Sequence, residues 1–95
     1  LDGKLAAQWG THTHVQTADE QILPNGTGYL TDLGMTGPVR SVIGVRPEQS
    51  IANFRGELTS RYEVAPGPCM LTGAVFTYDA AAKRCTGAER VRILD

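Results

Sequence analysis

Two histidines, His12 and His14, are the only histidines in this 95-residue chain and stand two positions apart. Side chains alternate between the faces of a β-strand, so on an extended strand both imidazoles would project from one side. In that arrangement they could bind one metal ion or two adjacent ions. Two histidines alone do not make a zinc site, because zinc needs at least one further protein ligand. The same spacing therefore fits two ordinary polar residues at a strand end equally well.

The residues around the histidine pair predict the elements that position it. Residues 5–9 form a short apolar run, and Gly10 ends this run where a strand would open into a loop. Loops on a rigid scaffold often carry functional side chains. The nearest carboxylates are Asp19, Glu20 and Asp32, and a carboxylate can orient a ligating imidazole. Capping or turn formation explains Asp19 and Asp32 equally well.

A longer pattern surrounds the pair: THTHVQTADE at 11–20, ILP at 22–24, GYLTDLGMTGP at 28–38 and SVIGV at 41–45. In this order the segments resemble the C-terminal part of the bacterial YmdB-like metallophosphoesterases, a branch of the calcineurin-like phosphoesterase superfamily. The resemblance covers nearly the whole chain and is weakest after Glu63. It implies hydrolysis of phosphodiesters, cyclic nucleotides among them, at two divalent transition-metal ions (Fe, Mn or Zn). It also implies that His12 and His14 are metal ligands, one for each ion.

The family's remaining ligands point to a longer protein. The resemblance places them upstream: an aspartate after the first strand, a bridging glutamate beside an asparagine, a second asparagine in a GNH-like motif, and one more histidine. This sequence contains none of these motifs, and Leu1 leads almost directly into the first expected strand. Residues 1–95 are therefore expected to form a single unit, the C-terminal fragment of a metallophosphoesterase domain. We expect the isolated chain to lack activity and to bind metal weakly or not at all.

Composition and charge fit one small domain and exclude two classes of partner. The chain is 41% hydrophobic, and nine basic against ten acidic side chains leave a formal charge of −1. It therefore lacks the basic surface that binds long nucleic acid or an anionic membrane. It contains no apolar run long enough to span a bilayer and no leader with a cleavage site, so a cytoplasmic location is expected.

One helix is expected in the middle of the chain. Pro47 suits a first helical position, Glu48 complements the positive end of a helix, and Gly56 marks the end. We expect this helix to cover one face of the sheet. Its apolar stripe comprises Ile51, Phe54 and Leu58, and Val45 can extend it.

Two hairpins are also expected. Asn25-Gly26, a strong hairpin signal, separates strands at 21–23 and 27–31. A second hairpin joins 69–78 to 84–94 across a short connection. If this hairpin closes on Ala81, then Leu71 opposes Val91, Val75 opposes Gly87 and Cys69 opposes Ile93. Four apolar residues would then share one face: Leu71, Val75, Val91 and Ile93.

The two cysteines are expected to remain free thiols. In this register Cys85 lies about eight residues along the hairpin from Cys69, or roughly 26 Å at 3.3 Å per residue. A disulfide spans a far shorter distance.

Together these patterns predict an α+β fold: a mainly antiparallel β-sheet with one short helix, forming part of the calcineurin-like phosphoesterase β-sandwich that the resemblance implies. Strand edges left exposed would favour self-association. Two functions remain open. The chain is either the C-terminal portion of a dinuclear metal-dependent phosphodiesterase or a non-catalytic binding or structural module with at most a weak metal site.

Overall fold

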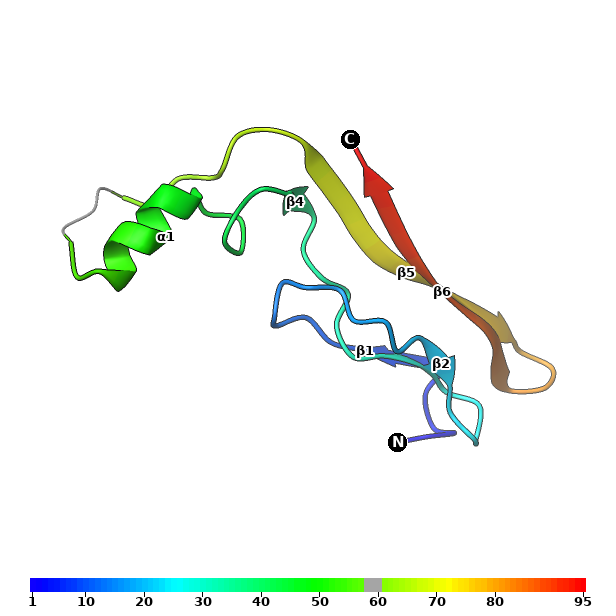
Figure 1. Cartoon of the computed structure of the whole chain (residues 1–95). Helices are drawn as coiled ribbons and strands as arrows, with labels where there is room; N and C mark the ends of the chain where they lie inside the picture. Colours follow the sequence, from blue (N-terminus) through cyan, green and yellow to red (C-terminus); the bar gives the residue numbers. More distant parts are fainter. Residues whose placement is uncertain (58–60) are drawn as a thin grey trace.

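The computed structural model describes residues 1–57 and 61–95 and arranges them in two small sheets and one helix (Figure 1). The first sheet contains β1 (Ala7–Trp9), β2 (Gln21–Ile22) and β3 (Gly28–Leu30), in the order β1-β3-β2. The second contains β4 (Gly37–Pro38), β5 (Cys69–Asp79) and β6 (Arg84–Leu94), in the order β4-β5-β6. The helix α1 spans Pro47–Phe54. The predicted mostly-β fold with one short helix is confirmed, but its strands form two sheets. No helix in the described ranges is long and apolar enough to cross a membrane.

The first sheet contains a parallel pair that the sequence did not reveal. β1 runs parallel to β3, with Ala7 opposite Gly28, whereas β2 runs antiparallel to β3. Parallel strands need a long connection, and no local turn motif in the sequence predicts such a pairing. The connection from β1 to β2 carries the histidine pair, so the crossover itself positions the candidate site.

A tight turn joins β2 to β3, as the Asn-Gly motif predicts. The carbonyl of Leu23 accepts a hydrogen bond from the backbone N–H of Gly26 at 2.9 Å. Gly26 has a φ of 100°, a conformation that favours glycine. A Cβ at this position would lie 2.6 Å from the Cβ of Arg84. Both the backbone conformation and the close approach of β6 therefore require glycine.

The β5–β6 hairpin forms as predicted, but in a different register. Leu71 opposes Ile93, two positions from its predicted partner Val91. One position of this shift comes from the loop, which closes on the pair Asp79 and Arg84. The other comes from a β-bulge between Thr77 and Tyr78. A bulge changes the register without leaving a clear mark in the sequence.

From Leu71 to Thr77 the shift is two positions, which leaves these side chains on their predicted face; beyond the bulge it is one position, so Cys85 opposes Tyr78 and lies on the other face from the one predicted. The face shared by Leu71, Val75, Val91 and Ile93 points outward, and the exposed fractions of Leu71, Val75 and Ile93 are 48%, 51% and 60%. On the opposite face Phe76 stacks on Trp9 of β1, with ring centroids 6.0 Å apart.

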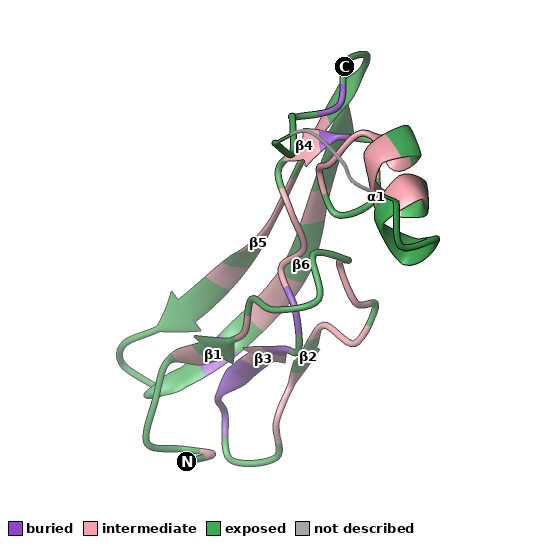
Figure 2. Ribbon diagram, turned by 90° about the vertical axis from the view of Figure 1, so that its left-hand side faces the viewer, coloured by how far each residue is buried: buried purple, intermediate pink, exposed green. Residues whose placement is uncertain are grey.

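Little of the chain is buried. The buried hydrophobic side chains in the described ranges are Leu30, Ala65 and Cys85, and Figure 2 shows buried residues on and beside β3. The accessible surface is 6652 Å² for a mass of 10.2 kDa. A folded monomer of this mass exposes about 5,300 Å². The radius of gyration is 17.5 Å, against about 12 Å for a compact domain of this length. The chain therefore presents more surface than a self-contained domain.

The helix lies on an arm that extends away from the sheets (Figure 1). It starts at Pro47, as predicted, and ends at Phe54, just before Gly56; Leu58 lies outside the described residues. The prediction that it covers a sheet face was wrong, because no residue of α1 is buried and Phe54 is 94% exposed. The flanking segments bind each other instead: Arg46 forms an ion pair with Glu63 at 3.0 Å.

The two thiols lie at opposite ends of the hairpin and are free, as predicted. Cys69 is exposed beside β4, where it opposes Pro38. Cys85 is fully buried and opposes Tyr78 near the hairpin loop.

This difference in burial predicts stepwise modification of the thiols. Under native, non-reducing conditions a thiol reagent should modify Cys69 first and Cys85 at least about tenfold more slowly, because Cys85 must wait for local opening. Mass spectrometry should then find two modifications once the chain is unfolded. The Cys69→Ser variant should lose the fast phase alone. An unfolded monomer that takes up no reagent would reveal a disulfide and contradict the structure.

Candidate metal site

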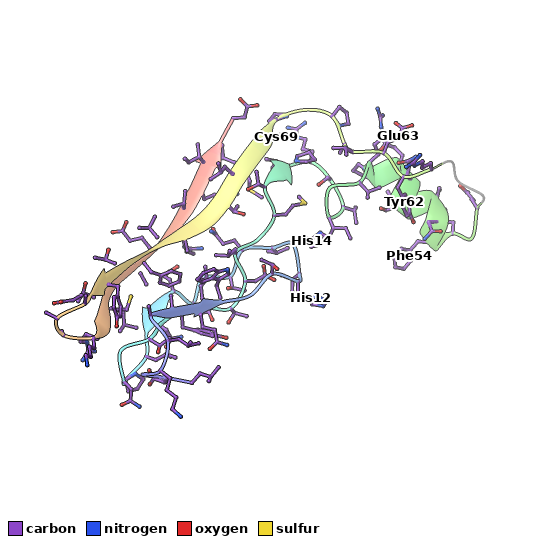
Figure 3. The ribbon with its side chains drawn as sticks, turned by 180° about the vertical axis from the view of Figure 1, so that it is seen from behind. His12, His14, Phe54, Tyr62, Glu63 and Cys69 are labelled. Atoms are coloured by element: carbon purple, nitrogen blue, oxygen red, sulfur yellow. The ribbon has the colours of Figure 1, made fainter. Side chains whose placement is uncertain are left out.

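The histidine pair lies on the loop after β1. β1 ends at Trp9, and residues 12–15 follow a bent path. His14 has a φ of 68°, a left-handed conformation that is uncommon for residues other than glycine. The prediction that both imidazoles share one face of a strand was therefore wrong. Both side chains are nevertheless exposed, and in Figure 3 they lie along the same edge of the loop.

One buried carboxylate explains the bend. Asp32, just after β3, is 2% exposed. Its Oδ2 accepts hydrogen bonds from the backbone N–H groups of His12 at 3.0 Å and Thr13 at 2.7 Å, and from the Thr13 hydroxyl at 2.7 Å. Its Oδ1 accepts one from the backbone N–H of Gly34 at 2.8 Å. These bonds tie the histidine loop to the end of β3.

The same bonds favour the ionised form of Asp32. The backbone N–H groups of Gly34 and Thr13 and the Thr13 hydroxyl hold the pKa of this carboxyl well below its usual range. Of the two roles that the sequence left open for Asp32, the structure shows loop formation, because the carboxylate binds the backbone of His12 and not its imidazole.

A second carboxylate, Asp19, fixes the other end of the connection. Its Oδ1 accepts hydrogen bonds from the Thr17 hydroxyl at 2.7 Å and the Thr31 N–H at 3.1 Å, and its Oδ2 accepts one from the Thr31 hydroxyl. The hydroxyls of Thr31 and Thr17 lower the pKa of Asp19 from 3.8 to about 2. Asp19, like Asp32, therefore serves the backbone path of the loop.

These lowered pKa values predict that the histidine loop loosens in acid. Both carboxylates have a lower pKa in the folded chain than in the unfolded chain, so their contribution to stability is complete well above pH 3.8 and is lost as pH falls through the folded pKa, which is about 2 for Asp19 and well below the usual range for Asp32. NMR titration should show the pKa of Asp19 near 2, and it should move toward 3.8 in Thr31→Val. Thr86→Val is a matched control, because the Thr86 hydroxyl lies on β6 and donates to Thr77. A titration of Asp19 near its ordinary pKa in the unmodified chain would contradict these hydrogen bonds.

The described residues supply two side chains of a type that binds divalent transition metals. Exposed imidazoles on a fixed loop are suitable zinc, iron or manganese ligands. In the described ranges, however, no cluster of three or more His, Cys, Asp and Glu side chains could hold an ion. His12 and His14 as ligands remain a prediction, and the other ligands must come from outside these residues.

A polar pocket of about 250 Å³ lies between the histidine loop and the hairpin. It is lined by residues 14–16 of the loop, by Met70 and Thr72 of β5, and by Arg90 and Arg92 of β6. The side-chain amide of Gln16 holds the two walls together by donating to the carbonyls of Gly73 and Val91, both at 3.0 Å. Sequence reasoning missed this pocket, because only the fold places β6 next to the loop.

Comparison with known proteins relates this geometry to a family. A family model described as "YmdB-like protein" matches residues 1–91. A 2',3'-cyclic-nucleotide 2'-phosphodiesterase from Bacillus subtilis (strain 168) is 47% identical over 94 residues, which are 99% of this chain and 36% of that protein. A putative phosphatase/phosphodiesterase from Mycoplasma pneumoniae is 42% identical over 96 residues, covering 100% of this chain and 34% of that protein. The chain thus spans about a third of the length of these curated relatives.

Solved structures give the same match. The chain resembles a hypothetical protein from Thermus thermophilus, with a TM-score of 0.89 and 33% identity over 99% of this chain and 36% of that one. It also resembles a novel phosphatase from Mycoplasma pneumoniae, with a TM-score of 0.90 and 42% identity over 98% of this chain and 34% of that one. The two sheets and the helix arm therefore correspond to part of a phosphatase fold.

Proposed function

The chain belongs to the YmdB-like protein family, and from this membership we propose that it is part of a dinuclear metal-dependent phosphodiesterase and supplies two metal ligands, His12 and His14. The observation that carries the proposal is the loop itself: two exposed imidazoles on a backbone held by buried Asp32. The Bacillus subtilis relative, a 2',3'-cyclic-nucleotide 2'-phosphodiesterase, supports a cyclic nucleotide as the substrate. We further propose a cytoplasmic location and a place in a calcineurin-like β-sandwich.

The proposed mechanism divides the work between the chain and its ions. Two bound iron, manganese or zinc ions would supply a hydroxide nucleophile at neutral pH and neutralise charge on the phosphate oxygens. His12 and His14 would hold these ions through imidazole nitrogens, and neither needs to transfer a proton. Asp32 would act as a positioning residue, because it fixes the backbone of His12 and Thr13.

The alternative is a non-catalytic binding or structural module with at most a weak metal site. The observation in its favour is that the described residues bring together two metal-type side chains and no third one. Either function agrees with self-association of the isolated chain, because its accessible surface of 6652 Å² includes exposed apolar side chains such as Leu71 and Ile93.

A comparison of two proteins tests the proposal. A polypeptide of the relatives' full length that carries this segment should hydrolyse a 2',3'-cyclic nucleotide when manganese, iron or zinc is present. The 95-residue chain should remain at background with every metal, because its described residues bring no third ligand to the two histidines. A full-length protein that is inert with all three metals would refute the proposal. If the 95-residue chain is active and His12→Ala abolishes this activity, the proposal that the remaining metal ligands lie outside the chain is refuted.

A further inference from the structure

We propose that the pocket between the histidine loop and β6 binds the phosphate group of the substrate, with Arg92 as its principal contact. This inference rests on the proposed function, because it assigns a substrate-binding role beside the proposed metal ligands. The pocket contains His14 from the loop and Arg92 from β6.

The charges of the lining favour an anion. Arg90 is neutralised, because its Nε lies 2.5 Å from Oε2 of Glu20. Arg92 has no ion-pair or hydrogen-bond partner among the described side chains, so one positive charge of the pocket is uncompensated. A guanidinium presents several N–H donors in a planar fork, which matches the oxygens of a phosphate.

A buried hydroxyl in the same lining also lacks a partner. The Oγ1 atom of Thr72 is buried and has no hydrogen-bond partner in the described part of the chain, although the Thr72 backbone N–H is satisfied by Thr36. Buried polar atoms are normally hydrogen-bonded, so this hydroxyl is available to a phosphate oxygen or to water. Thr72 lies opposite Arg92 in the β5–β6 ladder, so the hydroxyl and the free guanidinium belong to one cross-strand pair.

The size of the pocket limits what it can hold. At about 250 Å³ it is smaller than most sites for whole ligands, which measure about 300–1,000 Å³. It suits a phosphate with part of an attached sugar better than a complete nucleotide. The remainder of the substrate would then extend toward the exposed histidine loop.

A phosphate titration of the 95-residue chain tests the pocket without using activity. With inorganic phosphate as the probe, NMR should show saturable shifts at residues 14–16, Thr72 and Arg92, and Arg92→Gln should weaken this binding about tenfold. Thr72→Val should weaken it less. Arg40→Gln is the matched control, because Arg40 is exposed and does not line the pocket. Circular dichroism checks that each variant is folded.

A second measurement separates substrate phosphate from a free anion. In the full-length protein Arg92→Gln should raise KM for the cyclic nucleotide about tenfold while kcat and metal content change less than about twofold. Equal phosphate binding by Arg92→Gln and Arg40→Gln, or no saturable binding at all, would overturn the inference. An unchanged KM in Arg92→Gln would also overturn it. A full-length protein without hydrolytic activity would refute the proposed function, and the phosphate titration would still decide the role of Arg92.

Discussion

Asp32→Ala is expected to lower the hydrolytic rate of the full-length protein about 10- to 100-fold, the range typical of residues that position metal ligands. The carboxylate is 2% exposed and accepts four hydrogen bonds. Alanine would leave the N–H groups of His12, Thr13 and Gly34 without this partner. The histidine loop would then sample several conformations, and bound metal should fall together with activity.

Two variants make this prediction specific. Asp32→Asn keeps the size of the side chain and removes its charge, so it should lose less activity than Asp32→Ala. Asp79→Ala is the matched control, because Asp79 also accepts backbone N–H groups, from Ala81 and Ala82, but in the β5–β6 loop away from the histidines. If Asp32→Ala and Asp79→Ala behave alike in rate and metal content, the positioning role of Asp32 is wrong.

His12→Ala and His14→Ala should each lower hydrolysis in the full-length protein more than about 100-fold, because loss of a direct ligand exceeds the loss from a positioning residue. Both side chains are exposed and neither imidazole forms a hydrogen bond in the described ranges, so the fold should persist. The thermal midpoint should therefore stay close to that of the unmodified protein.

The matched control for the two histidines is Thr11→Ala, which changes an exposed residue of the same loop that does not line the pocket beside β6. It should retain activity and metal. Full activity in both histidine variants would show that the pair has no role in catalysis. Loss of activity accompanied by unfolding would show that the residues are structural.

Local sequence signals predicted the local elements well. Gly10 marks the end of β1, Asn25-Gly26 lies in the turn before β3, and Pro47 starts α1, because each acts through its own backbone preferences. Signals of this kind extend over a few residues and need no tertiary context.

The features that depend on distant contacts were missed. The parallel pairing of β1 with β3 spans a long connection, and the bulge at Thr77 and Tyr78 shifts the hairpin register without a sequence signature. The helix was expected on a sheet because its apolar stripe needs a cover. It lies instead on the arm, where Arg46 pairs with Glu63 and nothing in the described ranges buries the helix.

The candidate site was predictable in its residue types and not in its geometry. The spacing of His12 and His14 allowed metal ligation and the family resemblance implied it, but the strand assumed for them is a bent loop. The bend depends on hydrogen bonds from His12 and Thr13 to Asp32. Asp32 lies beside this loop only because β3 pairs with β1 in the sheet. The charge of Arg92 gains significance only once the fold places it beside that loop.

X-ray absorption spectroscopy of the metal-loaded full-length protein tests the central claim most directly, because it counts the imidazole nitrogens around the ions at about 2.0–2.1 Å. Unmodified protein, His12→Ala and His14→Ala should be compared at equal metal loading. We predict that each variant loses one imidazole from one of the two ions, so the average number of imidazoles per ion falls by about one half. An unchanged imidazole count in both variants would contradict the assignment of His12 and His14 as metal ligands.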